Sequence, residues 1–130
     1  MAKGSLKLES FKLLSRSKEN LKEMKTLLKS ALYYGAVNRA YYAIFQTISA
    51  LILFDHEIEF SSHKAVISYF GKNYAKEEKA PQEYHRIFIN TFNIRQMSDY
   101  DYDAIVTKEQ AEEIAENAKE IVDYVDKHIS

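Results

Sequence analysis

The sequence predicts an all-α protein, an antiparallel up-and-down bundle of four long helices and one short helix. Three observations support this fold class. Glycine and proline, which most often interrupt regular structure, occur only three times and once in 130 residues. Lys, Glu, Ala and Leu, which favour helices, are abundant. Apolar residues recur at intervals of three and four, as they do on one helix face. The length fits one domain, so we expect residues 1–130 to form a single helical domain.

The first two helices are expected over residues 10–31 and 33–54. In the first, apolar residues form one stripe and lysines lie opposite, which predicts an amphipathic helix. The second has apolar residues nearly all around, which predicts a helix buried on most sides. Asn38 and Arg39 stand out in it, because polar groups near a buried helix need partners. Asp99 is the expected partner of Arg39 across the bundle, unless Arg39 extends to solvent at a helix edge.

A short third helix is expected after Ser61 and Ser62, which offer an N-cap. Gly71 is its expected C-terminal stop, because glycine commonly ends helices. Residues 72–79 are rich in charge and are interpreted as a flexible connecting loop.

The last two helices have clear start signals. Pro81 stands where a first helical residue belongs and opens the fourth helix. Thr107 and Gln110 form a capping-box pattern. Behind them, apolar residues at helical spacing continue nearly to the C-terminus, which predicts a fifth helix.

Composition excludes several classes of protein. Without cysteine there is no disulfide framework, thiolate zinc site or thiol nucleophile. A net charge of −1 argues against a protein that binds nucleic acid over its whole surface, although a local basic patch is compatible with it. The N-terminus lacks the pattern of a signal peptide. The most apolar stretch, residues 40–54, is shorter than the roughly 20 residues of a membrane span. We therefore expect a cytoplasmic protein that does not enter a membrane.

Common cofactor and metal motifs are also missing. No glutamate lies three residues before any histidine, as in di-iron bundles, and no glycine-rich loop matches a nucleotide-binding fingerprint. No cofactor and no metal site are expected. Among the four histidines, His63 is interpreted as a local hydrogen-bonding residue, and the others as surface or interface residues.

One polar segment remains, residues 93–103, where the fourth helix ends. It places an arginine beside three aspartates and two tyrosines. Two interpretations stay open. Arg95 and Asp99 can form an i,i+4 ion pair, which contributes about 0.2–0.5 kcal/mol on an exposed helix. Alternatively, Arg95 points into a cleft, where its five N–H donors can hold a phosphate.

The chain resembles the HEPN superfamily of small helical domains of bacteria and archaea. Three segments carry this resemblance: residues 36–45 (AVNRAYYAIF), 62–66 (SHKAV) and 95–100 (RQMSDY). The resemblance implies a helical bundle that homodimerises and is often encoded beside a minimal nucleotidyltransferase as a toxin–antitoxin pair. The resemblance also implies that active members are metal-independent endoribonucleases. Their motif is an Arg, then four to six residues of which the first is polar, then a His, sometimes followed by a Tyr two residues later.

This chain departs from that motif at the histidine. Arg95 and Gln96 match the first two positions, but Tyr100 stands at the His position and Tyr102 at the trailing Tyr. Tyrosine, with an ordinary pKa of about 10, is only ~0.1% ionised at neutral pH, a poor replacement for a histidine near 6.5. Aspartates nearby would raise the pKa of a phenol further.

The sequence therefore favours a homodimeric binding module, paired with a minimal nucleotidyltransferase, that binds RNA or a nucleotide in its dimer cleft. The binding candidates are Asn38, Arg39, Gln96 and Asp99. The alternative is a metal-independent endoribonuclease toxin that uses Arg95 with Tyr100 and Tyr102. A third interpretation, a purely structural dimer, attributes the ten tyrosines to an interface, where tyrosine is enriched.

Overall fold

The computed structural model describes residues 3–100 and 105–129, with side chains from residue 6 onward. Within these residues the chain forms the five predicted helices and no strand, so the all-α fold class is confirmed. The elements are α1 (Lys3–Lys29), α2 (Tyr33–His56), α3 (His63–Phe70), a π-helical turn η1 (Gly71–Ala75), α4 (Gln82–Tyr100) and α5 (Lys108–Ile129).

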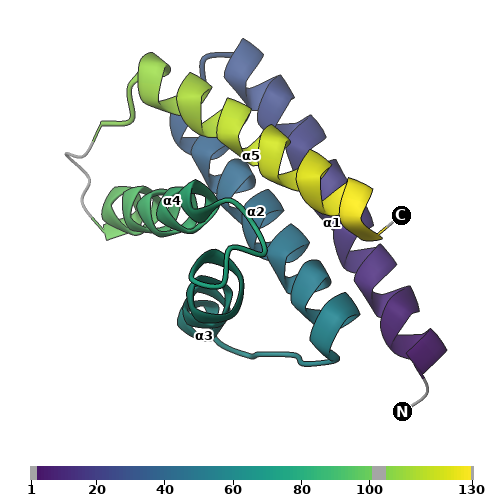
Figure 1. Cartoon of the computed structure of the whole chain (residues 1–130). Coiled ribbons are helices and arrows are strands. Elements are labelled where there is room, and N and C mark those ends of the chain that lie inside the picture. Colours follow the sequence, from purple (N-terminus) through teal and green to yellow (C-terminus); the bar gives the residue numbers. More distant parts are fainter. Residues whose placement is uncertain (1–2, 101–104, 130) are drawn as a thin grey trace.

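The helices are arranged around α2, which contacts all four of the others (Figure 1). α1 and α5 lie lengthwise along α2, whereas α4 lies across the bundle. Because α4 lies across, α5 returns in the same direction as α2. The ends of these two helices meet where His128 Nε2 lies 3.0 Å from Asp55 Oδ1. α1 runs antiparallel to both.

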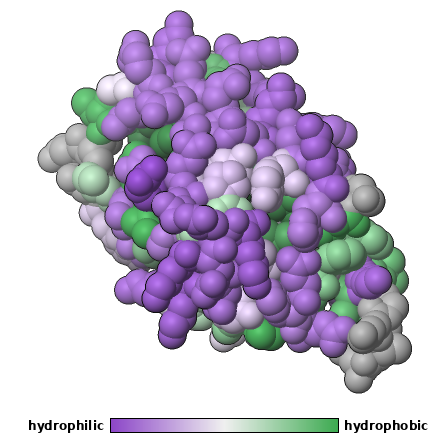
Figure 2. Space-filling view, in the orientation of Figure 1, coloured by the Kyte–Doolittle hydropathy of each residue, from purple (hydrophilic) through white to green (hydrophobic). Residues whose placement is uncertain are grey.

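The core follows from the composition of α2. Its apolar residues face every neighbouring helix, and Ala40, Tyr41, Ile44 and Ile48 are fully buried. This confirms the prediction of a helix buried on most sides. α5 has the opposite character, with one buried apolar stripe and an outer face of charged residues. Figure 2 shows hydrophilic residues over most of the face that α5 covers.

The predicted start signals are present in atomic detail. The Ser62 side chain accepts a hydrogen bond from the Ala65 N–H at 3.1 Å, which caps α3. At α5, Thr107 Oγ1 accepts from the Gln110 N–H at 3.1 Å, and Gln110 Oε1 accepts from the Thr107 N–H at 3.0 Å. This is the reciprocal capping box.

The α-helix α3 ends at Phe70 with Gly71 as its C-cap residue, at the predicted position, but not through a left-handed glycine. Gly71 keeps right-handed helical dihedrals (φ −61°, ψ −45°), and the chain continues through η1. Glycine serves a different purpose here, because the His85 ring of α4 occupies the space that a Cβ would need. The expected loop over 72–79 is correspondingly shorter, and Tyr74 within it is buried.

No helix in the described part of the chain combines the length and the apolar character that crossing a membrane requires.

Candidate functional site

Arg95 lies where α4 crosses α2, against two aromatic rings. Its guanidinium carbon is 5.0 Å from the ring centroid of Tyr41 and 5.1 Å from that of Tyr42. The side chain is only 18% exposed. Such cation–π contacts contribute about 0.5–2 kcal/mol, more when the cation is desolvated. The helix crossing therefore holds a positive charge in a fixed, aromatic setting.

Arg95 also makes the ion pair that the sequence left open. Arg95 Nη2 lies 3.6 Å from Asp99 Oδ2, one turn further along α4. Tyr34 of α2 donates its hydroxyl hydrogen to the other Asp99 oxygen. Arg95 Nε is buried and has no hydrogen-bond partner among the described residues. The guanidinium thus keeps unused donor capacity beside a loose ion pair.

His63 of α3 contacts the same two tyrosines, and we call Arg95, Tyr41, Tyr42 and His63 the Arg95 cluster. The sequence did not predict that His63 lies here. His63 Nδ1 lies 2.8 Å from Tyr41 Oη, and its ring stacks on Phe45 with centroids 4.1 Å apart. The hydrogen bond was predicted, but its partner is on another helix rather than local. Burial, followed by the positive charge of Arg95, lowers the pKa of His63 from its ordinary 6.5. Burial raises the pKa of Tyr41 above its ordinary 10, so its phenol stays neutral at physiological pH.

Arg39 and Asn38 lie beside the cluster, on the side of α2 that faces α1. Arg39 Nη1 donates to Asn20 Oδ1 at 3.0 Å, and Nη2 donates to Asn38 Oδ1 at 2.6 Å. Arg39 also lies 3.6 Å from the Glu23 carboxylate of α1. The expected pairing of Arg39 with Asp99 was therefore wrong.

The physical reason is position along and around α2. Arg39 faces α1, whereas Asp99 is bound by Arg95 and Tyr34 at the crossing with α4. Both arginines nevertheless reach the same ring, since the Arg39 guanidinium carbon lies 5.3 Å from the Tyr42 centroid. Tyr42 is thus contacted by two cations.

The remaining candidates are less enclosed. Tyr100 is 85% exposed at the end of α4, and Gln96 is half-buried beside Arg95. Tyr102 lies outside the described residues. No group of three or more potential metal-ligating side chains occurs in the described part of the chain.

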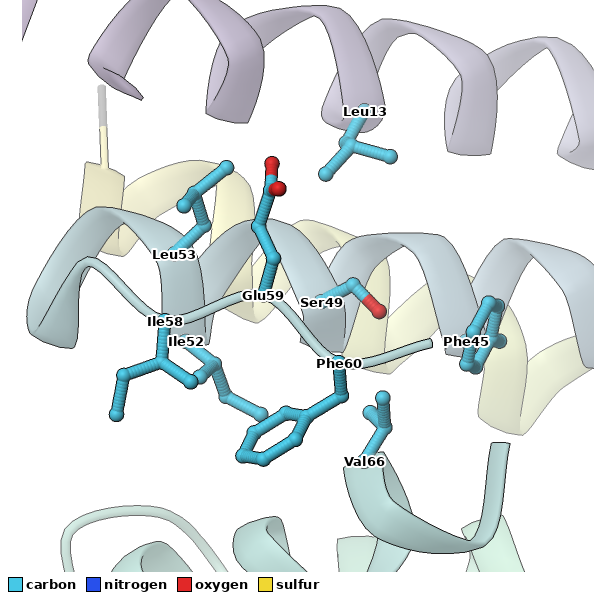
Figure 3. Close-up of a pocket in the computed structure, with 9 residues that line it drawn as sticks. All are labelled: Leu13, Phe45, Ser49, Ile52, Leu53, Ile58, Glu59, Phe60 and Val66. Atoms are coloured by element: carbon cyan, nitrogen blue, oxygen red, sulfur yellow. The ribbon is translucent and has the colours of Figure 1, made fainter. Parts of the chain in front are cut away.

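A separate apolar cavity of about 220 Å³ lies between α1, α2 and the connection to α3. Leu13, Ile52 and Phe60 are among its lining residues, and the Glu59 carboxylate lies at its edge (Figure 3). It contains no cationic side chain among those residues, so it is not suited to phosphate. Phe45 lines this cavity and also stacks on His63.

Comparisons with known proteins agree with this architecture. A family model described as the HEPN domain matches residues 11–128. A Methanocaldococcus jannaschii protein named "Putative toxin MJ0605" is 37% identical over 115 residues, covering 88% of this chain and 84% of the relative. A Thermotoga maritima protein named "UPF0332 protein" is 32% identical over 114 residues, covering 88% and 86%. A second M. jannaschii protein, "Putative toxin MJ0142", is 33% identical over 106 residues, covering 82% and 71%.

The family match includes α2, α3, α4 and nearly all of α5, and with them every side chain of the cluster around Arg95. The resemblance carried by three short sequence segments is therefore confirmed over almost the full length. The chain belongs to the HEPN domain family.

Proposed function

We propose that this chain is a homodimeric binding module that binds RNA or a nucleotide at Arg95, in a cleft at the dimer interface. We further propose that it pairs with a minimal nucleotidyltransferase in a toxin–antitoxin-like system. The observation that carries the ligand is the Arg95 guanidinium held against the rings of Tyr41 and Tyr42. A fixed guanidinium suits a phosphate, and aromatic side chains suit a base.

The existing partner of Arg95 supports exchange for a phosphate. The 3.6 Å separation from Asp99 is longer than a charge-assisted hydrogen bond of about 2.7–2.9 Å. An incoming phosphate oxygen at Arg95 Nη2 would therefore replace a weak interaction. Arg39 adds a second positive charge on the far side of the cluster, through its contact with Tyr42.

The experiment is RNA binding by fluorescence anisotropy with a labelled single-stranded RNA. Arg95→Ala should weaken binding about tenfold or more, because a hydrogen bond to a charged group contributes about 1.5–3 kcal/mol. Arg86→Ala is the matched control, since it removes the same charge from an exposed position on the same helix. An equal loss of RNA affinity in both variants would mean that binding depends only on the overall positive charge of the protein, and that Arg95 does not form the binding site.

The pairing has its own test. Two relatives bear the name toxin, which supports a toxin–antitoxin context. Co-expression of this chain with the product of a neighbouring nucleotidyltransferase frame should give a complex that elutes together in size exclusion. Separate elution at micromolar concentration would contradict the proposed partner.

A second candidate function is a metal-independent endoribonuclease toxin that uses Arg95 with Tyr100 or Tyr102. The toxin names of the relatives favour it. Its test is incubation of the purified chain with total RNA in excess chelator. Cleavage that disappears in Arg95→Ala would support this candidate, and intact RNA at all times would leave the binding module in its place.

A further inference from the structure

One histidine side chain lies beside Arg95, although this chain has Tyr100 where the family motif has its histidine on α4. The described residues include all four histidines of the chain, and only His63 contacts the rings that hold Arg95. His56 lies at the end of α2, His85 packs against Gly71, and His128 pairs with Asp55. No other histidine contacts Tyr41 or Tyr42.

The geometry fixes the His63 ring from three directions. Tyr41 Oη binds Nδ1 at 2.8 Å, Phe45 stacks on one face, and the Tyr42 ring meets it edge-on at 6.0 Å. Tyr41 therefore contacts both residues: its hydroxyl is hydrogen-bonded to His63, and its ring makes the cation–π contact with Arg95. His63 remains partly exposed. A ring oriented by one nitrogen, with the other available, is the arrangement of a proton-transfer histidine.

We infer that His63 is the proton-transfer residue of the Arg95 site and acts on the ribose 2′-hydroxyl of bound RNA. This inference rests on the second candidate function. In this chain the proton-transfer histidine would be the first residue of α3, rather than a residue at the α4 position that Tyr100 occupies.

The proposed step needs no metal and no co-reactant other than water. When His63 Nδ1–H donates to Tyr41 Oη, Nε2 carries a lone pair. The 2′-oxygen attacks the adjacent phosphorus, its proton passes to Nε2, and the P–O5′ bond breaks while the 5′-oxygen takes a proton from water. The hydroxide that remains takes the proton from Nε2, which restores the neutral ring of His63 and re-forms the water. The products are a 2′,3′-cyclic phosphate and a 5′-hydroxyl. Arg95 binds the phosphate oxygens, which gain negative charge in the transition state.

The electrostatic setting keeps this base in its active form. Tyr41 and Tyr42 of α2 and Arg95 of α4 are the titratable or charged groups around the ring. Burial disfavours the imidazolium most, because the charged ring would lose its hydration, and the Arg95 cation disfavours it further. The lowered pKa of His63 therefore leaves the ring unprotonated at neutral pH.

The experiment compares His63→Asn, His56→Asn and wild type on a DNA oligonucleotide that contains a single ribonucleotide, in excess chelator. An all-DNA oligonucleotide is the substrate control, because it has no 2′-hydroxyl. Asparagine can still hydrogen-bond to Tyr41, which favours a folded variant, but it cannot exchange a proton near neutral pH. His56→Asn is the matched control at an exposed position outside the cluster.

If the inference is correct, His63→Asn lowers kcat about 100-fold or more while KM changes little, and His56→Asn retains the wild-type rate. The wild-type rate should fall on the acid side as His63 becomes protonated, and the residual rate of His63→Asn should lack this limb. Added imidazole should partly restore His63→Gly, which a merely structural role of His63 would not produce. Circular dichroism checks that each variant is folded.

The other outcomes separate the inference from the proposed functions. Cleavage by folded His63→Asn within threefold of wild type would overturn the role of His63 and keep the nuclease. No cleavage by wild type, with Arg95-dependent RNA binding intact, would overturn the role of His63 and keep the binding module. Neither cleavage nor Arg95-dependent binding would overturn both candidate functions and the inference with them.

Discussion

Arg39 and Arg95 illustrate how two arginines on neighbouring helices acquire different surroundings. Both contact the Tyr42 ring, yet Arg39 is hydrogen-bonded to Asn20 and Asn38, while Arg95 pairs with Asp99. Asn20 is itself buried and donates to Gln46 at 2.7 Å. Arg39 therefore belongs to a polar network between α1 and α2, and its energetic contribution should depend on α1 rather than on α4.

Arg39→Ala should lower the free energy of unfolding by about 1–2 kcal/mol. Its hydrogen bonds to two asparagines would be lost, but the side chain is already 32% exposed, so water can replace part of them. Urea denaturation measures the change. A double-mutant cycle of Arg39→Ala with Asp99→Asn should be additive within about 0.5 kcal/mol. A larger coupling energy would restore the pairing of Arg39 with Asp99.

His63 makes the stability of the protein depend on pH. Its folded-state pKa is lowered, so on acidification the unfolded chain binds a proton first, at about pH 6.5. The free energy of unfolding should therefore decrease as the pH falls below 6.5. Denaturation at pH 7.5 and pH 5.5 should show a larger loss for wild type than for His63→Asn. An equal loss in both proteins would show that His63 is not the group responsible.

The sequence singled out Arg95 as a candidate residue and offered its ion pair with Asp99, but it did not predict the contacts of Arg95 with Tyr41 and Tyr42. Arg95 stood out because it lies in a polar segment at a helix end. His63 was interpreted as local because it follows two serines, and its partner Tyr41 is 22 positions away in the chain. Tyr41 and Tyr42 were assigned to an apolar helix. These contacts join residues on different helices, so no periodic pattern in the sequence reveals them.

At the scale of elements, the sequence predicted the N-terminal caps of α3 and α5 correctly, but it placed the start of the first helix at residue 10 rather than at Lys3. The serine cap of α3 and the capping box of α5 are hydrogen bonds between residues three apart in the chain. Because both partners lie in one short segment, the sequence pattern alone predicts these hydrogen bonds. Gly71 was misinterpreted because the reason for a glycine there lies on another helix, in the ring of His85. The helix continues through η1, where buried Tyr74 donates to Asp55 at 2.8 Å.

Gly71→Ala tests this account with an unambiguous sign. Alanine favours a helix over glycine by about 1 kcal/mol, so helix propensity alone would stabilise the protein. The new Cβ would instead meet the His85 ring, and overpacking costs about 1–3 kcal/mol. We expect thermal denaturation to show a lower Tm for Gly71→Ala.

The control for this substitution removes the obstacle. In a His85→Ala background, Gly71→Ala should be neutral or stabilising, because space for the Cβ is then available. A stabilising effect of Gly71→Ala in the wild-type background would mean that the His85 ring moves aside at little cost.

At the scale of the whole molecule, exposed apolar side chains gather where the start of α2 meets the end of α4. Tyr34 is 46% exposed, Met97 58% and Tyr100 85%. The contact between Tyr34 and Asp99 brings these two helix ends together beside Arg95. Large apolar side chains left on a surface mark interaction sites when they are contiguous. This surface is the one through which we expect the proposed homodimer to form, with the Arg95 site at its margin.

Sedimentation equilibrium of the wild-type chain at micromolar concentration should give about twice 15.1 kDa. Met97→Glu should shift the equilibrium toward monomer by about tenfold or more in the dimer dissociation constant. Two-fold symmetry places the new charge twice in one interface, where it must be desolvated near its copy. Leu8→Glu is the matched control, because Leu8 is 53% exposed on α1. A monomer at every concentration would refute the dimer. A dimer that tolerates Met97→Glu but dissociates with Leu8→Glu would place the interface on α1, away from the Arg95 site.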